Sequence, residues 1–270
     1  MKILDFIKSN TLLKMTSLNA PVILVRQFIS LFIRRVIAEN FGESGIFLQG
    51  QLRSLIQLLT SFTSLGIFNG IVKYISEFKE DEKQLAALFS TTFVFTAIGS
   101  VISALVLLIW HDGFSNYLFG TDRYAYLIQL IALLVPMISL QRVFNGVING
   151  LSQYKKFAKI DLLSYLLSSA LIIGFLYADN FDGVLIAIAI TPAIQLGILL
   201  WVFAKVLTQY LKFKDLYFKA PLANFFIAFS LMSFFSTVIL STVEIEIRNM
   251  ILRQIRSEEH TSELQSPDHL

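Results

Sequence analysis

Cysteine is absent from the 270-residue sequence, which excludes disulfide bonds, thiol catalysis and metal sites with cysteine ligands. Histidine is nearly absent. Only three occur, and two of them, His260 and His269, lie in the last fifteen residues. The third, His111, lies in a connection between apolar segments, where a lone histidine indicates no catalytic role. We therefore expect neither a metal nor another cofactor.

Charge is also scarce, because 15% of the residues are charged whereas 55% are hydrophobic. The mean hydropathy of +0.68 is outside the range of soluble globular domains. Apolar stretches of about twenty residues recur along nearly the whole chain, and this is the helix length that crosses the hydrocarbon core of a bilayer. The sequence therefore predicts an all-α polytopic membrane protein.

Polar breaks divide the apolar stretches into seven predicted transmembrane helices. The predicted spans are residues 12–38, 46–72, 84–110, 125–150, 160–178, 183–206 and 223–252. The N-terminus has no continuous apolar region followed by a small-residue cleavage site, so we expect an uncleaved first helix. The predicted loops are too short to form a catalytic domain outside the membrane.

Lysine is distributed unequally between the two sets of loops. The N-terminus and every second loop contain Lys2, Lys8, Lys73, Lys79, Lys83, Lys155, Lys156, Lys159, Lys205, Lys212, Lys214 and Lys219. The alternate loops contain one cation, Arg123. Because cytoplasmic loops carry the excess of lysine and arginine, this asymmetry predicts a cytoplasmic N-terminus.

Polar side chains recur at intervals of three and four residues in several predicted spans, which places them on one face of each helix. The stripes are Arg26, Gln27, Ser30 and Arg34; Arg53, Gln57, Thr60, Ser61 and Ser64; and Arg142, Asn145 and Asn149. Serine and threonine in such stripes indicate helix packing. An arginine near the middle of a bilayer, however, needs a partner or a water-filled cavity.

Arg26, Arg53 and Arg142 have no carboxylate at pairing distance within their own predicted spans. They are the leading candidates for an anion-binding cavity, because a guanidinium group suits phosphate oxygens. The other candidates to line this cavity are Gln57, Asn69, Lys73, Asn145 and Arg248. For Arg248 an ion pair with Glu244, four residues earlier, is the alternative interpretation.

The tripeptide Phe-Asn-Gly occurs at residues 68–70 and 144–146, at the predicted cytoplasmic ends of two spans. Asparagine and glycine are common in helix C-caps, so two helix ends are the simpler interpretation. Two related structural units are the alternative.

The stretches "FGESGIFLQGQLRSLIQLL" (41–59) and "GIFNGIVKYISEF" (66–78) resemble the first two helices of Wzx-type polysaccharide flippases. These flippases belong to the multidrug/oligosaccharidyl-lipid/polysaccharide (MOP) exporter superfamily. Within it, the likeness is greatest to lipid III flippases of enterobacterial common antigen synthesis and to O-antigen translocases. It covers roughly residues 15–252.

The resemblance implies a carrier that moves an undecaprenyl-diphosphate-linked oligosaccharide from the cytoplasmic to the periplasmic leaflet of the bacterial inner membrane. It implies two six-helix lobes around a cationic cavity with alternating access. Residues 1–208 would form the N-terminal lobe, and residues 209–255 a linker and the first helix of the second lobe. The implied partners are the lipid-linked oligosaccharide, membrane lipid, and polysaccharide polymerisation and chain-length proteins, but no nucleic acid.

Three other functions are alternatives to a flippase. A drug or cation antiporter of the same superfamily should have membrane carboxylates in its N-terminal lobe, where Asp161 is the only candidate. A membrane enzyme of polysaccharide assembly should have a sizeable loop to hold its catalytic groups. A structural subunit of such an assembly is the remaining alternative.

Residues 256–270, "RSEEHTSELQSPDHL", differ in composition from the rest of the chain, with four carboxylates and one arginine. The string resembles the translation of a sequencing-adapter oligonucleotide. We therefore expect this segment to be an assembly artefact joined to a truncated reading frame, so that the chain is an N-terminal fragment of a flippase.

Overall fold

The computed structural model describes residues 11–64, 68–210, 235–236, 238–251 and 254. Its elements are α2 (Thr11–Ser64), α3 (Phe68–Phe78), α4 (Glu82–Ile109), α5 (His111–Phe119), η1 (Asp122–Tyr124), α6 (Ala125–Gly150), α7 (Tyr154–Tyr177) and α8 (Phe181–Tyr210). Residues 238–251 are also helical. No strand occurs in these ranges, which confirms the all-α prediction. The predicted segment 256–270 and the beginning of the seventh predicted span lie outside them.

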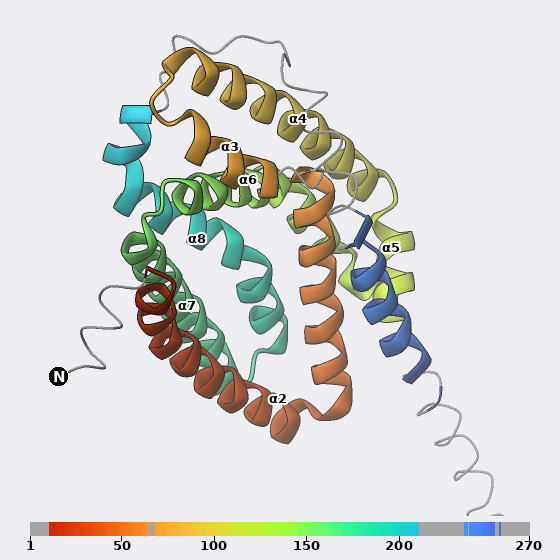
Figure 1. Cartoon of the computed structure of the whole chain (residues 1–270). Helices are drawn as coiled ribbons and strands as arrows, with labels where there is room; N and C mark the ends of the chain where they lie inside the picture. Colours follow the sequence, from red (N-terminus) through yellow and green to blue (C-terminus); the bar gives the residue numbers. More distant parts are fainter. Residues whose placement is uncertain (1–10, 65–67, 211–234, 237, 252–253, 255–270) are drawn as a thin grey trace, which may run out of the picture.

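Helix α2 consists of two arms that meet at Gly42, where the backbone has φ 61° and ψ −157°. Only glycine adopts this region without strain, so the chain can reverse here, as Figure 1 shows at the lower end of α2. We call residues 11–41 the first arm and residues 43–64 the second arm. The reversal lies in "ENFGES" (39–44), which is the break that the sequence predicts between the first two spans.

Four described helices are long and apolar enough to cross a bilayer: α4, α6 together with η1, α7 and α8. The pair α2 and α3, bent by 49° at the break between them, counts as a fifth. The chain is therefore a polytopic α-helical membrane protein, but the predicted number of seven spans is not confirmed. One reason is that both arms of α2 count as a single helix, and another is that residues 223–234 are not among the described ones.

Two predicted connections are wrong. The loop predicted after residue 110 contains the helix α5 and the turn η1. The span predicted over 46–72 ends at Ser64, and α3 begins at Phe68, so the first Phe-Asn-Gly begins a helix instead of capping one. The second Phe-Asn-Gly, at residues 144–146, lies inside α6, which continues to Gly150. The apolar residues of α3 face α6 at helical spacing, and this spacing made α3 look like the continuation of the second span.

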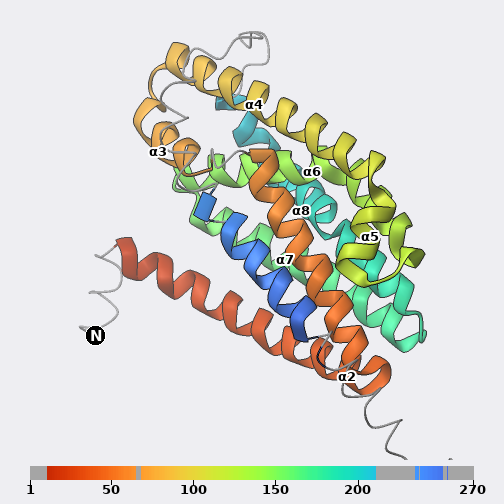
Figure 2. The ribbon, with the colours of Figure 1, turned by 90° about the vertical axis from the view of Figure 1, so that its right-hand side faces the viewer.

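Helix α4 begins at Glu82 because Asp81 caps it. The Asp81 carboxylate accepts hydrogen bonds from the backbone N–H groups of Lys83 at 3.0 Å and Gln84 at 3.1 Å. These bonds, with that from Gln84 the strongest influence, lower the pKa of Asp81. The cap limits the connection between α3 and α4 to three residues, which keeps the two helices side by side (Figure 2).

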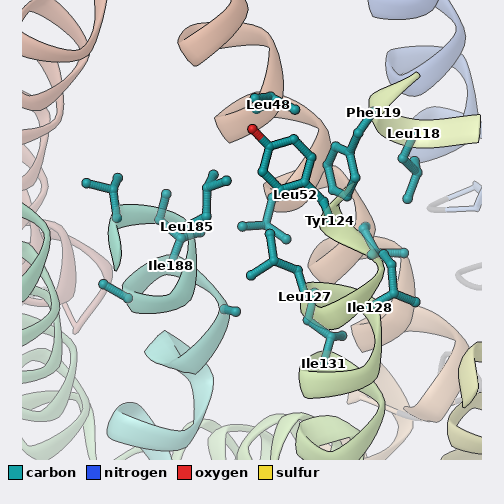
Figure 3. Packing of buried hydrophobic residues seen from close by; sticks show 14 of the residues in the cluster. Leu48, Leu52, Leu118, Phe119, Tyr124, Leu127, Ile128, Ile131, Leu185 and Ile188 are labelled. Carbon is teal, nitrogen blue, oxygen red and sulfur yellow. The ribbon is translucent and has the colours of Figure 1, made fainter. Parts of the chain in front are cut away.

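Helix α6 is the most buried of the four single-helix spans, and it contributes to both clusters of buried hydrophobic residues. In the first cluster Leu127 and Ile131 of α6 pack with Leu52 of α2 and Leu185 of α8 (Figure 3). The second cluster joins α6 to α3, α4, α7 and α8. Of the most apolar stretch of each span, 56% is buried in α6 and 28% in α4. The spans α4, α7 and α8 thus leave most of their apolar stretches exposed.

Helix α4 approaches the second arm of α2 closely at Gly99. A Cβ atom built there would lie 2.7 Å from the backbone oxygen of Thr63. On the next residue, the Ser100 hydroxyl donates a hydrogen bond to Ser139 of α6 at 2.7 Å. Small residues at such crossings let helix backbones approach in a bilayer, where the hydrophobic effect does not drive helices together.

Replacement of Gly99 by alanine should destabilise the protein by about 1–3 kcal/mol, because the added methyl group meets backbone, which has no rotamer to change. The measurement is the melting temperature of the purified protein in detergent. Gly174→Ala in α7 is the matched control, since no atom lies within 4 Å of its added Cβ. Equal melting temperatures for the two variants would contradict the close approach.

Candidate functional site

Arg26, in the first arm of α2, is joined to two residues of α7. Its Nη1 atom lies 2.6 Å from Oδ2 of Asp161. Its guanidinium carbon lies 5.0 Å from the centre of the Tyr165 ring, and the Tyr165 hydroxyl donates a hydrogen bond to the backbone oxygen of Arg26 at 3.0 Å. Asp161 and Tyr165 are four residues apart, so they lie on one face of α7. Three contacts therefore fix Arg26 to α7.

Arg53 faces the same region from the second arm of α2. Its side chain is half-buried, and it lies within electrostatic range of Arg26, Arg34 and Tyr165. No carboxylate pairs with Arg53 in the part of the chain that the structure describes. We call Arg26, Arg34 and Arg53, together with Asp161 and Tyr165, the arginine cluster. It holds three guanidinium groups and one carboxylate.

The cluster has the properties of an anion site. A partly buried arginine without a counter-ion is costly in a bilayer, and two further positive charges nearby increase that cost. An anion that lies between Arg26 and Arg53 removes the repulsion between them. The planar fork of guanidinium hydrogen-bonds phosphate oxygens in pairs, so a phosphate or diphosphate group suits these residues.

Gln57 lies one helical turn after Arg53 on the second arm and is exposed. Its backbone oxygen accepts a hydrogen bond from the Ser61 hydroxyl at 3.4 Å. Residues four apart share a helix face, so Gln57 presents an amide beside the Arg53 guanidinium. The structure thus keeps together the arginine and the amide of the predicted second stripe.

Arg142 lies where α6 meets α3. Its guanidinium carbon is 3.8 Å from the centre of the Phe68 ring, which is a close cation–π contact. Asn145, one turn further along α6, is buried, and its side-chain oxygen has no hydrogen-bond partner among the described residues. Asn69 and Lys73 are exposed on α3. Four of the predicted cavity residues therefore belong to the α3–α6 crossing.

Arg248 has partners of its own. It donates a hydrogen bond to the Ser54 hydroxyl of α2, and it lies 3.7 Å from the Glu244 carboxylate. Ser54 in turn donates to Glu244 at 3.3 Å. The ion pair with Glu244, the alternative interpretation of Arg248, is thus present, and it extends to the second arm of α2.

A second polar contact lies one turn away on the same two segments. Gln51 donates a hydrogen bond from Nε2 to Oδ1 of Asn249 at 2.7 Å. A Cβ atom at Gly50 would lie 2.9 Å from Nε of Arg248, so the Arg248 side chain passes close to the backbone of the second arm there. Residues 238–251 are therefore bound to the second arm of α2 through polar groups, and Figure 2 shows the two segments side by side.

Sequence analysis missed two members of the arginine cluster. It noted Asp161 only as a carboxylate that a cation antiporter would need, and it did not single out Tyr165. The spacing of Asp161 and Tyr165 at four residues was visible, but no pattern connects them to Arg26, 135 residues earlier. The residues predicted to line one anion-binding cavity lie in three groups: the cluster with Gln57, the α3–α6 crossing and the Arg248 contacts.

The family described as polysaccharide biosynthesis protein matches residues 34–259, which is most of the chain. The chain belongs to this family. Two relatives, the lipid III flippases of Escherichia coli (strain K12) and Shigella flexneri, are each 26% identical over 251 residues. These matches cover 90% of this chain and 59% of each relative, so the chain spans about three fifths of their length. No solved structure matches the chain.

Arg53 and Arg26 should respond in opposite ways to replacement by methionine. Arg53→Met removes a half-buried charge without a counter-ion, so the anion-free protein should become more stable by on the order of 1 kcal/mol. Arg26→Met leaves Asp161 without its partner, so it should destabilise by a similar amount. Melting temperatures in phosphate-free detergent solution test this. A loss of stability in Arg53→Met would show that Arg53 already has a counter-ion.

Proposed function

We propose that the protein is a flippase for an undecaprenyl-diphosphate-linked oligosaccharide, either enterobacterial common antigen lipid III or an O-antigen unit. One observation carries the proposal: Arg53 is half-buried, adjoins two further arginines and has no carboxylate partner among the described residues. The family and the two lipid III flippases support it, because a lipid-linked oligosaccharide of this class presents a diphosphate inside the membrane region.

In this proposal the arginine cluster binds the diphosphate. Arg53 and Arg26 contact its oxygens, and Gln57 donates hydrogen bonds beside them. Arg142, Asn145, Asn69 and Lys73 form a second polar region at the α3–α6 crossing for the phosphate or the sugar. Positive charge from both regions stabilises the headgroup while it leaves water, which is the costly step of moving a charged group between leaflets.

The proposed site belongs to a transporter with two lobes in a membrane. Residues 1–208 act as the N-terminal lobe, and residues 209–255 as a linker and the first helix of a second lobe that includes Arg248. The protein lies in the bacterial inner membrane with its N-terminus in the cytoplasm, and the two lobes alternate access to the cavity. Polysaccharide polymerisation and chain-length proteins are its proposed partners.

A cation antiporter fits the site less well. The carboxylate that such a transporter would use, Asp161, already pairs with Arg26 at 2.6 Å. The cluster as a whole has more positive than negative charge, which repels a cationic substrate.

Complementation tests the proposed function. The complete gene that encodes these residues should restore surface polysaccharide in a bacterial strain without its own flippase. Arg26→Ala, Arg53→Ala or Arg142→Ala should abolish restoration, because each removes a cation that binds the diphosphate or the sugar–phosphate headgroup. Immunoblots of the membrane fraction should show normal amounts of each variant.

Arg123→Ala is the matched control. Arg123 is exposed outside the cluster and lies 3.4 Å from Asp182, so its replacement should leave restoration intact. Restoration by the Arg53 variant, or failure of the unaltered gene, would count against the flippase.

A further inference from the structure

We infer that Asp161 is an internal counter-anion, which holds Arg26 while the site is empty and which the phosphate group of the ligand displaces. The inference deepens the proposed function and rests on it, since it concerns the same arginine cluster. Asp161 is then a positioning residue, because it acts on the ligand through Arg26.

The Arg26–Asp161 pair is placed so that it can open. The side chain of Arg26 is 41% exposed and that of Asp161 is 19% exposed, so the arginine can be reached while the carboxylate is mostly covered. Of the three guanidinium nitrogens of Arg26, only Nη1 hydrogen-bonds to a carboxylate oxygen of the described residues. A guanidinium has five N–H groups, so a second anion can approach before the first contact is lost.

Charge in the cluster favours displacement over sharing. A diphosphate that bridges Arg53 and Arg26 brings negative charge next to the Asp161 carboxylate, and the two anions repel each other. The diphosphate carries the greater charge and also satisfies Arg53, which Asp161 leaves without a partner. Asp161 therefore leaves Arg26 when the ligand binds.

Tyr165 keeps Arg26 in place during this exchange. Its hydroxyl bonds the Arg26 backbone oxygen at 3.0 Å, and its ring lies beneath the guanidinium. Neither contact depends on the carboxylate. The arginine thus stays aimed at the cluster while its anion changes.

The exchange affects how the first arm of α2 is held. The arm is anchored by Ile33 and Ile37, which are buried near its Gly42 end. Around Arg26 its apolar side chains are exposed, including those of Leu24 and Phe28. The contacts of Arg26 with Asp161 and Tyr165 therefore join this part of the arm to α7. When the ligand displaces Asp161, the arm loses one of these contacts and keeps those of Tyr165, which links binding of the ligand to how firmly the arm is held.

Binding of inorganic pyrophosphate to the purified chain in nanodiscs tests the inference, by calorimetry and by the rise in melting temperature on binding. Asp161→Asn should bind pyrophosphate about fivefold tighter than the unaltered chain, because no internal anion competes for Arg26. Asp161→Glu keeps the charge and should bind like the unaltered chain. Asp182→Asn, at the exposed pair with Arg123, is the control and should not change the affinity.

Arg53→Ala separates the two proposals. If the unaltered chain binds pyrophosphate, and Arg53→Ala weakens this at least about tenfold, the anion site is established. Equal or weaker binding by Asp161→Asn would then overturn the role of Asp161 alone. If neither the unaltered chain nor Asp161→Asn binds, both proposals are overturned.

A competition experiment identifies the source of the phosphate. Polyprenyl diphosphate incorporated into the nanodiscs should compete with pyrophosphate, and should do so more strongly in Asp161→Asn. Competition by soluble pyrophosphate without competition by the lipid would keep the role of Asp161 and would count against a lipid-linked substrate.

Discussion

Positive charge inside a hydrocarbon layer must be matched by negative charge, but the arginine cluster has more positive than negative charge. Three guanidinium groups share one carboxylate, because Asp161 is taken by Arg26 and no carboxylate pairs with Arg53 in the described part of the chain. The arrangement of α2 and α7 produces this excess of positive charge. The reversal at Gly42 brings the second arm of α2 back towards the first, so Arg53 faces Arg26, and α7 packs beside the first arm and supplies the one counter-ion that the described residues provide.

The second arm of α2 shows how neighbouring residues acquire different roles. Successive residues on a helix point about 100° apart, so Ser54 faces residues 238–251 while Arg53 faces the cluster. Arg248, which has Glu244 and Ser54 as partners, therefore strengthens packing between two segments. Arg53 has no such partner in the described part of the chain, so the proposed function assigns it to the ligand. The two arginines differ in the hydrogen-bond acceptors that surround them.

The features that local pattern determines were predictable from the sequence. Composition gives the membrane class, and the segment around Gly42 gives the reversal between the first two spans. Helix α5 was missed because nine residues with three aromatic side chains and a glycine have no clear period. The arginine stripes and the Glu244–Arg248 pair were visible, but Asp161 lies 135 residues from Arg26 and Ser54 lies 194 residues from Arg248 in sequence. Such pairings depend on how the helices pack, and a single sequence does not contain that information in local form.

Apolar packing is distributed differently around helix α6 and around the first arm of α2. Helix α6 belongs to both hydrophobic clusters, so any displacement of α6 would open the core on two sides. In the described part of the first arm of α2, the fully buried apolar side chains, Ile33 and Ile37, lie towards Gly42, whereas Ile29 is partly buried and Arg26 adds polar contacts with α7. Apolar packing resists displacement regardless of charge, whereas an ion pair yields to a stronger anion. In the proposed exchange, the ion pair of Arg26 is therefore the contact that responds to a charged ligand, while the apolar core around α6 keeps its shape.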